Sequence, residues 1–239
     1  MGQLFIIIPA YNEEANIESV AHEWHEIVKQ IGTTSRLVVI DDGSKDSTYQ
    51  KLLNLQEELP QLIPLTKSNT GHGATLLYGY EYALKHGAEY IFQTDSDGQT
   101  LPSEFYEFWE KRNQYSVIIG NRNHREDGFS RVLVTKTLKV VLRMIFGINI
   151  TDANTPYRLM ERKVLERYIK QVPEQFNLSN VMLTVLFIYH KESVLFLPIT
   201  FKARQGGVNS INIKSITKIG LQAVKDFRVI KKNMKKECQ

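Results

Sequence analysis

The sequence predicts an α/β protein with a mostly parallel central sheet, helices on both of its faces and a C-terminal amphipathic helix. Several short apolar runs show no polar alternation, which is typical of strands that are buried on both faces. Helix-like segments separate these runs, as in parallel sheets with crossover helices. Three of the runs end in polar clusters, and the ligands of such sheets bind at the carboxyl ends of the strands.

The elements follow from these patterns in chain order. The expected strands are the apolar runs Leu4–Ile8, Leu37–Ile40, Leu62–Thr66, Tyr90–Thr94, Val117–Ile119 and Val194–Lys202. The expected helices are Glu14–Gln30, one from Ser47 or Thr48, one between Gly73 and Gly87, Val132–Ile148, Pro173–Tyr189 and an apolar stripe within Ser215–Lys236. With no internal repeat or linker, residues 1–212 are predicted to form one domain and residues 213–239 a basic tail.

Composition is that of an ordinary globular protein. The 239 residues are 42% hydrophobic and 23% charged, and the single cysteine, Cys238, excludes an internal disulfide. No apolar run approaches the ~18 residues of a membrane span. The N-terminus lacks the basic region and cleavage site of a signal peptide, so a cytoplasmic location is expected.

Charge is distributed unevenly along the chain. Residues 202–239 hold ten Lys/Arg and two Asp/Glu, whereas the first 201 residues are mildly acidic. A basic tail on an acidic body predicts an anionic partner, namely a membrane, a nucleic acid or an acidic protein, or else a solvated helix.

The most informative segment is Asp95-Ser96-Asp97, which directly follows an apolar run. On an extended segment residues i and i+2 share a face, so both carboxylates can approach one cation. Oxygen ligands that leave coordination positions open suit Mg²⁺ or Mn²⁺ held together with a ligand's phosphates. An acidic turn is the alternative for the segment taken alone.

Other clusters at the predicted sheet edge fit a nucleotide. Tyr11 offers a ring for a base, and Glu13 and Asp42 offer hydrogen-bond acceptors. Other nucleotide folds fit poorly, because the chain has no P-loop and Leu76 replaces the third glycine of a dinucleotide fingerprint. The histidines show no zinc-ligand spacing and are predicted to be ordinary surface or core residues.

Three segments resemble the motifs of family 2 glycosyltransferases, which have the GT-A fold. They are Phe5-Ile6-Ile7-Ile8-Pro9-Ala10-Tyr11-Asn12-Glu13-Glu14, Val39-Ile40-Asp41-Asp42-Gly43-Ser44-Lys45-Asp46-Ser47-Thr48 and Asp95-Ser96-Asp97-Gly98-Gln99. The chain resembles above all the dolichol- or polyprenyl-phosphate sugar synthases, whose further motifs match Asn69-Thr70-Gly71-His72-Gly73, Gly120-Asn121-Arg122 and the stretch from Asp152 to Tyr157-Arg158.

The resemblance implies a role for each matching position. The nucleoside of a UDP- or GDP-linked sugar would lie against Pro9, Tyr11, Glu13, Ile40 and Asp42. The metal and the diphosphate would be held by Asp95, Ser96, Asp97 and Gln99, with Arg204 closing over the diphosphate. The acceptor phosphate would be bound by Arg122, Arg131 and Thr135. Apart from the resemblance, Asp152 is a candidate base or orienter of the acceptor site, with a structural cap near Thr151 as the alternative.

The chemistry of the acceptor favours a lipid phosphate. A sugar hydroxyl needs a carboxylate base within hydrogen-bond reach, whereas a phosphate is already ionised and needs cations. The segment Asn177-Leu178-Ser179-Asn180-Val181, where hydroxyl-transferring relatives often carry an acidic pair, has no acid. The predicted function is therefore inverting, metal-dependent sugar transfer to a polyprenyl phosphate. Transfer to a glycan hydroxyl in polysaccharide assembly is the alternative, and a non-catalytic sugar-nucleotide binder is a remote one.

A polyprenyl phosphate acceptor implies contact with the cytoplasmic face of a membrane. The contact would use a basic face of Lys136, Lys139 and Arg143 together with the tail's cations Lys225, Arg228, Lys231, Lys232, Lys235 and Lys236. The tail could instead dock on a membrane-embedded partner protein. On this hypothesis no nucleic acid is a partner.

Overall fold

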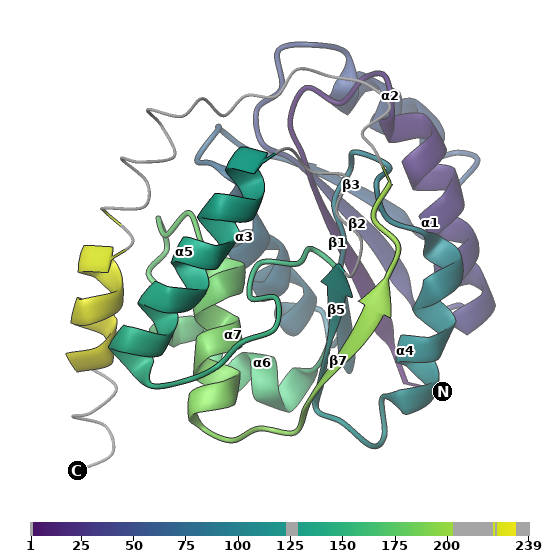
Figure 1. The fold of residues 1–239 in the computed structure, drawn as a ribbon. Coiled ribbons are helices and arrows are strands. Elements are labelled where there is room, and N and C mark those ends of the chain that lie inside the picture. The colour runs from purple at the N-terminus through teal and green to yellow at the C-terminus, as the bar shows by residue number, and fades with distance from the viewer. Residues whose placement is uncertain (1, 123–128, 203–221, 223, 233–239) are drawn as a thin grey trace.

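The computed structural model describes residues 2–122, 129–202, 222 and 224–232, with the helical backbone alone for residues 129–136. Seven strands form one sheet in the order β3-β2-β1-β4-β6-β5-β7. The strands are β1 (Leu4–Ala10), β2 (Arg36–Asp41), β3 (Leu62–Thr66), β4 (Tyr90–Gln93), β5 (Val117–Arg122), β6 (Arg158–Glu161) and β7 (Val194–Ile199). All neighbours pair in parallel except β6, which is antiparallel to both β4 and β5. The mostly parallel sheet predicted from the apolar runs is confirmed (Figure 1).

Helices cover both faces of the sheet. They are α1 (Ile17–Ile31), α2 (Thr48–Leu55), α3 (His72–Lys85), α4 (Phe105–Lys111), α5 (Phe129–Phe146), α6 (Arg162–Tyr168) and α7 (Ser179–Tyr189), with short 3-10 turns at Pro102–Glu104 and Ile169–Gln171. Helices α1, α2 and α4 pack on one face, and α3, α5, α6 and α7 pack on the other. The alternation within β1 explains the two cores, because Phe5 and Ile7 belong to one cluster whereas Leu4, Ile6 and Ile8 belong to the other.

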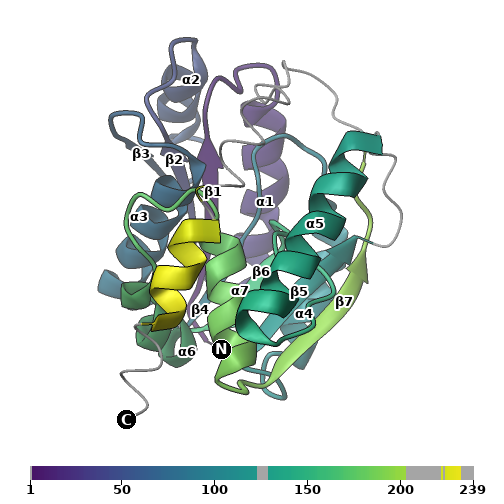
Figure 2. The same cartoon turned by 60° about the vertical axis from the view of Figure 1, so that its left-hand side comes forward.

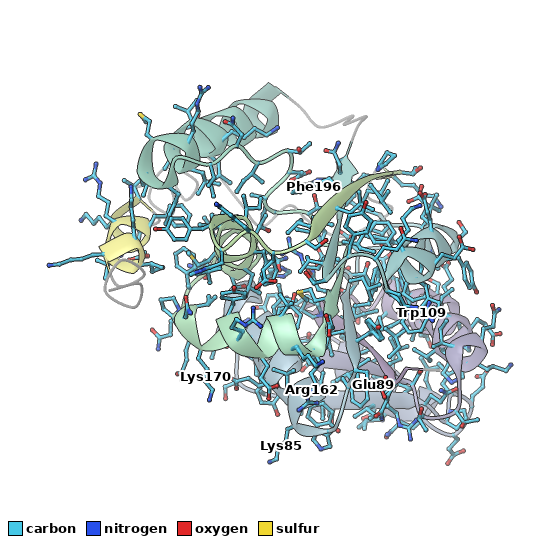
Figure 3. All side chains as sticks on the ribbon, turned by 90° about the horizontal axis from the view of Figure 1, so that it is seen from below. Lys85, Glu89, Trp109, Arg162, Lys170 and Phe196 are labelled. Carbon is cyan, nitrogen blue, oxygen red and sulfur yellow. The ribbon has the colours of Figure 1, made fainter. Side chains whose placement is uncertain are left out.

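Strand β6 is not among the strands that the sequence predicts. Its four residues begin with an arginine and end with a glutamate, so it lacks the apolar run that marks the other strands. It forms because β4 and β5 provide hydrogen-bonding partners on both of its sides. At the lower edge of the sheet, seen from below in Figure 3, the Arg162 backbone N–H donates to the Glu89 carbonyl (2.9 Å) and ties the end of β6 to the start of β4.

The helix boundaries also differ in places from the predicted ones. Helix α7 begins at Ser179, whereas the pattern predicts a start at Pro173, since residues 173–178 form turns. Helices α4 and α6 are short and are not predicted, because seven residues carry too little periodicity.

The C-terminal part of the described chain is helical at residues 222 and 224–232. Phe227 and Ile230 are buried there, and the Phe227 ring packs edge-on against Phe146 (5.8 Å) and Phe176 (5.6 Å). The predicted amphipathic helix extends at both ends beyond the described residues, so its full length stays a prediction, as does the boundary at residue 212. Among the helices of the described residues, none has the length and hydropathy to cross a bilayer.

Candidate active site at the carboxyl edge of the sheet

The polar segments that follow β1, β2 and β4 meet at one edge of the sheet, the upper edge in Figure 1. Strands β1 and β2 end side by side, with Ala10 opposite Asp41. The segment after β4 joins them, because the Thr94 backbone N–H donates to the Ile7 carbonyl (3.2 Å). The prediction that these clusters form one edge of the sheet is confirmed.

The loops after β1 and β2 hold each other through side chains. Asn12 has a φ of 54°, and its backbone N–H donates to Ser44 Oγ (2.9 Å) while its Oδ1 accepts from the Lys45 backbone (2.9 Å). Asparagine tolerates this left-handed conformation better than most residues do. The Glu13 backbone N–H donates to Thr48 Oγ1 (2.9 Å). Tyr11, next to Asn12 in the same loop, is 42% exposed.

Asp42 is buried and already accepts several internal hydrogen bonds. Its donors are Lys67 Nζ and the backbone N–H groups of Thr70 (3.0 Å) and Gly71 (2.9 Å). Burial by itself raises the pKa of Asp42, but the hydrogen bonds from Lys67 and Thr70 outweigh it and hold the pKa below its ordinary value. Asp42 is therefore an anionic group that holds Lys67 and the residues before α3 against the end of β2.

Two other residues expected at the nucleoside lie inside the protein. Ile40 is fully buried in the core cluster, and Pro9 is buried within β1. Glu13 is also largely buried, and its Oε2 accepts a hydrogen bond from the Asn16 side chain (3.0 Å). The contact of Pro9 and Ile40 with a nucleoside therefore stays a prediction.

Asp95 and Asp97 lie half-buried immediately after β4, and Ser96 between them is buried. Burial raises the pKa of Asp95 well above its ordinary value, and the neighbouring Asp97 carboxylate raises it further. Like charges held this close are stabilised when a cation joins them, and oxygen ligands suit Mg²⁺ or Mn²⁺. The described residues contain no group of three His, Cys, Asp or Glu side chains arranged to hold a metal. Two carboxylates would leave coordination positions of such a cation open to the oxygens of a ligand.

Gln99 has a structural partner that the sequence does not predict. Its Nε2 donates to the Lys202 carbonyl (2.7 Å), and the Lys202 backbone N–H donates to the Gln99 carbonyl (2.8 Å). Gln99 thus fastens the chain that follows β7 to the acidic segment, and its Oε1 is the atom that could face a metal. Arg204 is two residues further on and lies outside the described residues.

Arg122 at the end of β5 forms a two-bond ion pair with Asp152. Arg122 Nε donates to Asp152 Oδ2 (2.8 Å) and Nη2 donates to Oδ1 (2.9 Å), and both side chains are largely buried. The Phe201 ring lies under the guanidinium at 5.2 Å. The pair fixes the orientation of Arg122 at the site edge, since a planar fork of two bonds permits one geometry. Arg131 and Thr135 lie in the first turns of α5, where side chains are outside the described part of the structure.

Several residues at or below the site are not predicted from the sequence. His72 opens α3 with its Nε2 4.0 Å from Asp95 Oδ1, although its spacing marks it as an ordinary histidine. Gln93 Nε2 donates to Asp95 Oδ1 (3.3 Å), and Gln93 Oε1 accepts from Asn180 (3.0 Å) and Tyr80 (3.3 Å). This buried network links α3 and α7 to the acidic pair, and no local sequence signal indicates it.

Arg158 lies under the same network and is completely buried. Its guanidinium donates to the carbonyls of Thr155, Asn180 and Ala153 and to the Thr184 hydroxyl. None of these hydrogen-bond acceptors is a carboxylate. Burial lowers the pKa of Arg158, and the nearby Tyr80 and Asp152 act in the opposite direction. A buried cation therefore sits beneath the acidic edge.

Gly73 allows α3 to begin against the loop before α7. A Cβ at this position would lie 2.1 Å from the Phe176 carbonyl oxygen and 2.9 Å from the Asn177 backbone. These atoms belong to the backbone and cannot move aside by a rotamer change. We expect Gly73→Ala to lower the free energy of unfolding by about 2–3 kcal/mol or more, measured by urea denaturation.

Gly147→Ala is the matched control for that substitution. Gly147 has a φ of 74° and nothing within 4 Å of a built Cβ, so only the backbone conformation is strained. Its expected cost is about 1 kcal/mol. Equal effects at the two glycines would contradict the close approach of α3 to the loop.

Comparison with known proteins identifies the family. Residues 5–169 match the family model described as Glycosyl transferase family 2. The chain belongs to this family. It is a glycosyltransferase, and the resemblance noted in the sequence is confirmed. The remote alternative, a non-catalytic sugar-nucleotide binder, is not retained.

Relatives in this family carry names of lipid-phosphate sugar transferases. The polyprenol monophosphomannose synthase of Mycolicibacterium smegmatis is 28% identical over 220 residues, which cover 88% of this chain and 82% of the relative. The dolichyl-phosphate beta-glucosyltransferase of Trichomonas vaginalis is 29% identical over 66% of this chain and 51% of its own length. An undecaprenyl-phosphate 4-deoxy-4-formamido-L-arabinose transferase of Pectobacterium atrosepticum is 24% identical over 69% of this chain and 50% of its own length. The chain thus spans most of the first relative and about half of the other two.

Solved structures of other glycosyltransferases share the fold. Glucosyl-3-phosphoglycerate synthase from Mycobacterium tuberculosis, in complex with Mn²⁺, UDP-glucose and phosphoglyceric acid, superposes with a TM-score of 0.70 at 16% identity over 96% of this chain and 80% of that one. The same enzyme in complex with Mg²⁺ and UDP superposes with a TM-score of 0.68 at 15% identity, over 94% of this chain and 79% of that one. The likeness confirms the predicted GT-A fold.

Proposed function

We propose that this glycosyltransferase moves a sugar from a UDP- or GDP-linked donor to a polyprenyl phosphate, with inversion at the anomeric carbon and with Mg²⁺ or Mn²⁺ bound. The observation that carries the proposal is the placement of the Asp95–Asp97 pair and the oriented Arg122 at one sheet edge. An acidic pair suits a metal-bound diphosphate, and an arginine suits an incoming phosphate. The names of the relatives support this choice of acceptor.

On the donor side, the exposed Tyr11 ring would stack on the base. The hydrogen bonds of Asp42 hold Lys67 and the Thr70–Gly71 backbone where the nucleoside is proposed to bind. Pro9, Glu13 and Ile40 are also proposed to contribute to that end of the site. Ser96 and Arg204 are proposed to contact the diphosphate.

Asp95 and Asp97, with the Oε1 of Gln99, are the groups proposed to hold the cation. Their carboxylate oxygens fit a divalent metal. A bound cation would offset the burial and the like charge of Asp97 that raise the pKa of Asp95. When bound, Mg²⁺ or Mn²⁺ would stabilise negative charge on the leaving diphosphate. Gln93 orients Asp95 through its hydrogen bond, so the protein side of this arrangement is preorganised.

On the acceptor side, Arg122, Arg131 and Thr135 are proposed to bind the phosphate and aim one of its oxygens at the anomeric carbon. A phosphate monoester is ionised at neutral pH and needs no general base. Asp152 therefore orients Arg122 through their two hydrogen bonds, in preference to accepting a proton.

Transfer to a sugar hydroxyl is the second candidate. It requires a carboxylate base near the acceptor. Hydroxyl-transferring relatives often carry an acidic pair in the segment that here forms the start of α7. Asn180 lies in this segment, and its buried side chain forms hydrogen bonds with Gln93 and Tyr80. This arrangement disfavours the second candidate.

The deciding experiment is transfer of radiolabel from a panel of UDP- and GDP-sugars into organic-extractable polyprenyl phosphate. We expect label in the lipid phase with Mg²⁺ or Mn²⁺, and its loss when EDTA removes the metal. Glycerol 3-phosphate and oligosaccharides serve as soluble acceptors for comparison. Donor hydrolysis without lipid labelling, or labelling of an oligosaccharide alone, would overturn the lipid-phosphate proposal.

A further inference from the structure

Two helical segments that are about 80 residues apart in the chain lie together on one side of the molecule (Figures 1 and 2). They are α5 and the helical residues 224–232, here called the two-helix surface. Their inner faces join through the Phe146–Phe227 ring contact and through a hydrogen bond from Lys231 Nζ to the Ile145 carbonyl. Lys231 thereby provides a hydrogen bond and a positive charge to the last turn of α5. Its role is therefore structural, and it is not counted among the cations of the outer face.

The outer face of this surface carries apolar side chains in contact with water. Met144 is 71% exposed, Val229 is 59% exposed and Val140 is 55% exposed. They are three of the five exposed large hydrophobic residues found in the described part of the chain, the others being Tyr11 and Tyr78. A single exposed apolar residue needs no explanation. Val140 and Met144, however, lie one turn apart on α5, and Val229 is exposed on the helix that packs against α5.

The same two helices carry exposed cations. The five exposed ones are Lys139, Arg143, Lys225, Arg228 and Lys232. Asp226 is the single acidic residue among described residues 137–148 and 222–232, and its carboxylate accepts a hydrogen bond from Gln222 (2.9 Å). Helical spacing places Val140 next to Arg143 and Met144, and Lys139 next to Arg143, on the surface of α5. A hollow of about 300 Å³ between the helices is lined by Val141, Met144, Ile145, Val224, Arg228 and Lys231.

We propose that the two-helix surface binds directly to an anionic bilayer, with Met144 and Val229 inserted at the boundary between headgroups and acyl chains. Cations interleaved with exposed apolar side chains are typical of helices that lie in a membrane interface. The cores of protein–protein interfaces are depleted in lysine, whereas Lys and Arg can keep their charged ends at lipid phosphates while their stems pack on apolar groups.

The geometry connects this surface to the candidate site, and here the inference rests on the proposed function. Helix α5 begins near the carboxyl edge of the sheet and runs away from it along the side of the molecule (Figure 2). A bilayer against α5 would therefore bring lipid phosphates close to the edge where Arg122 lies. The inference thus adds insertion of apolar side chains into the bilayer to the electrostatic attraction expected from the basic residues.

Flotation with vesicles of phosphatidylcholine, with or without phosphatidylglycerol and free of polyprenyl phosphate, tests the inference apart from catalysis. We expect the full chain to float with anionic vesicles and to retain part of its binding in high salt. Met144→Asp combined with Val229→Asp should weaken partitioning at least tenfold. Lys139→Gln and Arg143→Gln should each weaken it about fivefold.

Tyr78→Asp is the matched control for an exposed apolar residue outside the surface, and Lys85→Gln at the end of α3 is the control for charge. Both should float like the unchanged chain. Asp97→Asn should also float normally, so a failed catalytic proposal and a failed membrane proposal are distinguishable.

Three results would overturn the inference. The first is no binding to either kind of vesicle. The second is vesicle binding that the combined Met144→Asp and Val229→Asp substitutions leave unchanged. The third is binding to native membranes that protease treatment abolishes, with no binding to vesicles. The last would indicate a membrane-embedded protein partner.

Discussion

Asp97→Asn is expected to reduce sugar transfer by at least about 100-fold, because stabilisation of the leaving group by a bound divalent cation contributes several kcal/mol. Asparagine keeps an oxygen that can accept the Gln99 backbone hydrogen bond (3.1 Å), so the local fold should persist. It removes a negative charge from the proposed metal site. The measurements are the rate of lipid labelling and the binding of Mn²⁺ in the presence of UDP, followed by electron paramagnetic resonance.

Glu107→Gln is the matched control, since it removes one carboxylate from an exposed position on α4 paired with Lys111 (3.9 Å). It should leave both the rate and Mn²⁺ binding unchanged. If Asp97→Asn retained a tenth or more of the activity and bound Mn²⁺ normally, Asp97 would not be a metal ligand.

Arg158→Met is expected to lower the free energy of unfolding by about 3 kcal/mol. The substitution removes five hydrogen bonds from four buried acceptors. Bonds to a charged donor contribute about 1.5–3 kcal/mol each. Relief of the desolvation cost of the buried cation, several kcal/mol, offsets part of that sum. The urea midpoint should therefore fall, with an unchanged denaturant slope.

Arg167→Met is the control for an arginine at the surface. Arg167 pairs with Glu192 (2.6 Å) in contact with solvent, and its removal should leave the urea midpoint nearly unchanged. An Arg158→Met midpoint equal to that of the unchanged chain would show that the buried hydrogen bonds do not stabilise the fold.

Arg158 also has a consequence for the chemistry. A cation without a carboxylate partner in its hydrogen-bond shell, lying below Asp95 and Asp152, adds positive potential at the edge where the proposed diphosphate would bind. Any Arg158→Met protein that still folds should therefore bind UDP more weakly than the unchanged chain does. Isothermal titration with UDP and Mn²⁺ measures that change, and equal affinity would assign Arg158 a structural role alone.

Much of the fold follows from local patterns in the chain. The run Leu4–Ala10 is buried along its whole length, and its lack of polar alternation predicts a strand covered on both faces. Asp95 and Asp97 are separated by one residue, so their joint approach to one cation is already implied by strand geometry. The spacing of apolar residues and of the two aspartates depends only on residues that are close in sequence. Both can therefore be recognised without a tertiary structure.

The residues that support the site come from distant parts of the chain. His72 reaches Asp95, Gln99 holds Lys202, and Asn180 binds Gln93 across 87 positions. Strand β6 exists because β4 and β5 flank it, and it buries Arg158, although arginines are mostly exposed in proteins. The exposed apolar residues on α5 and residues 224–232 form one surface only after the two segments pack together.

The sequence by itself determined the family, the parallel sheet and the acidic pair, because each depends on the order of residues over short stretches. The tertiary structure alone decided which acids already have partners, as with Asp42 and Lys67 or Asp152 and Arg122. It also decided which apolar side chains meet water. Partners and exposure depend on how distant segments pack, and packing is set by the whole chain's burial of apolar surface and pairing of polar groups.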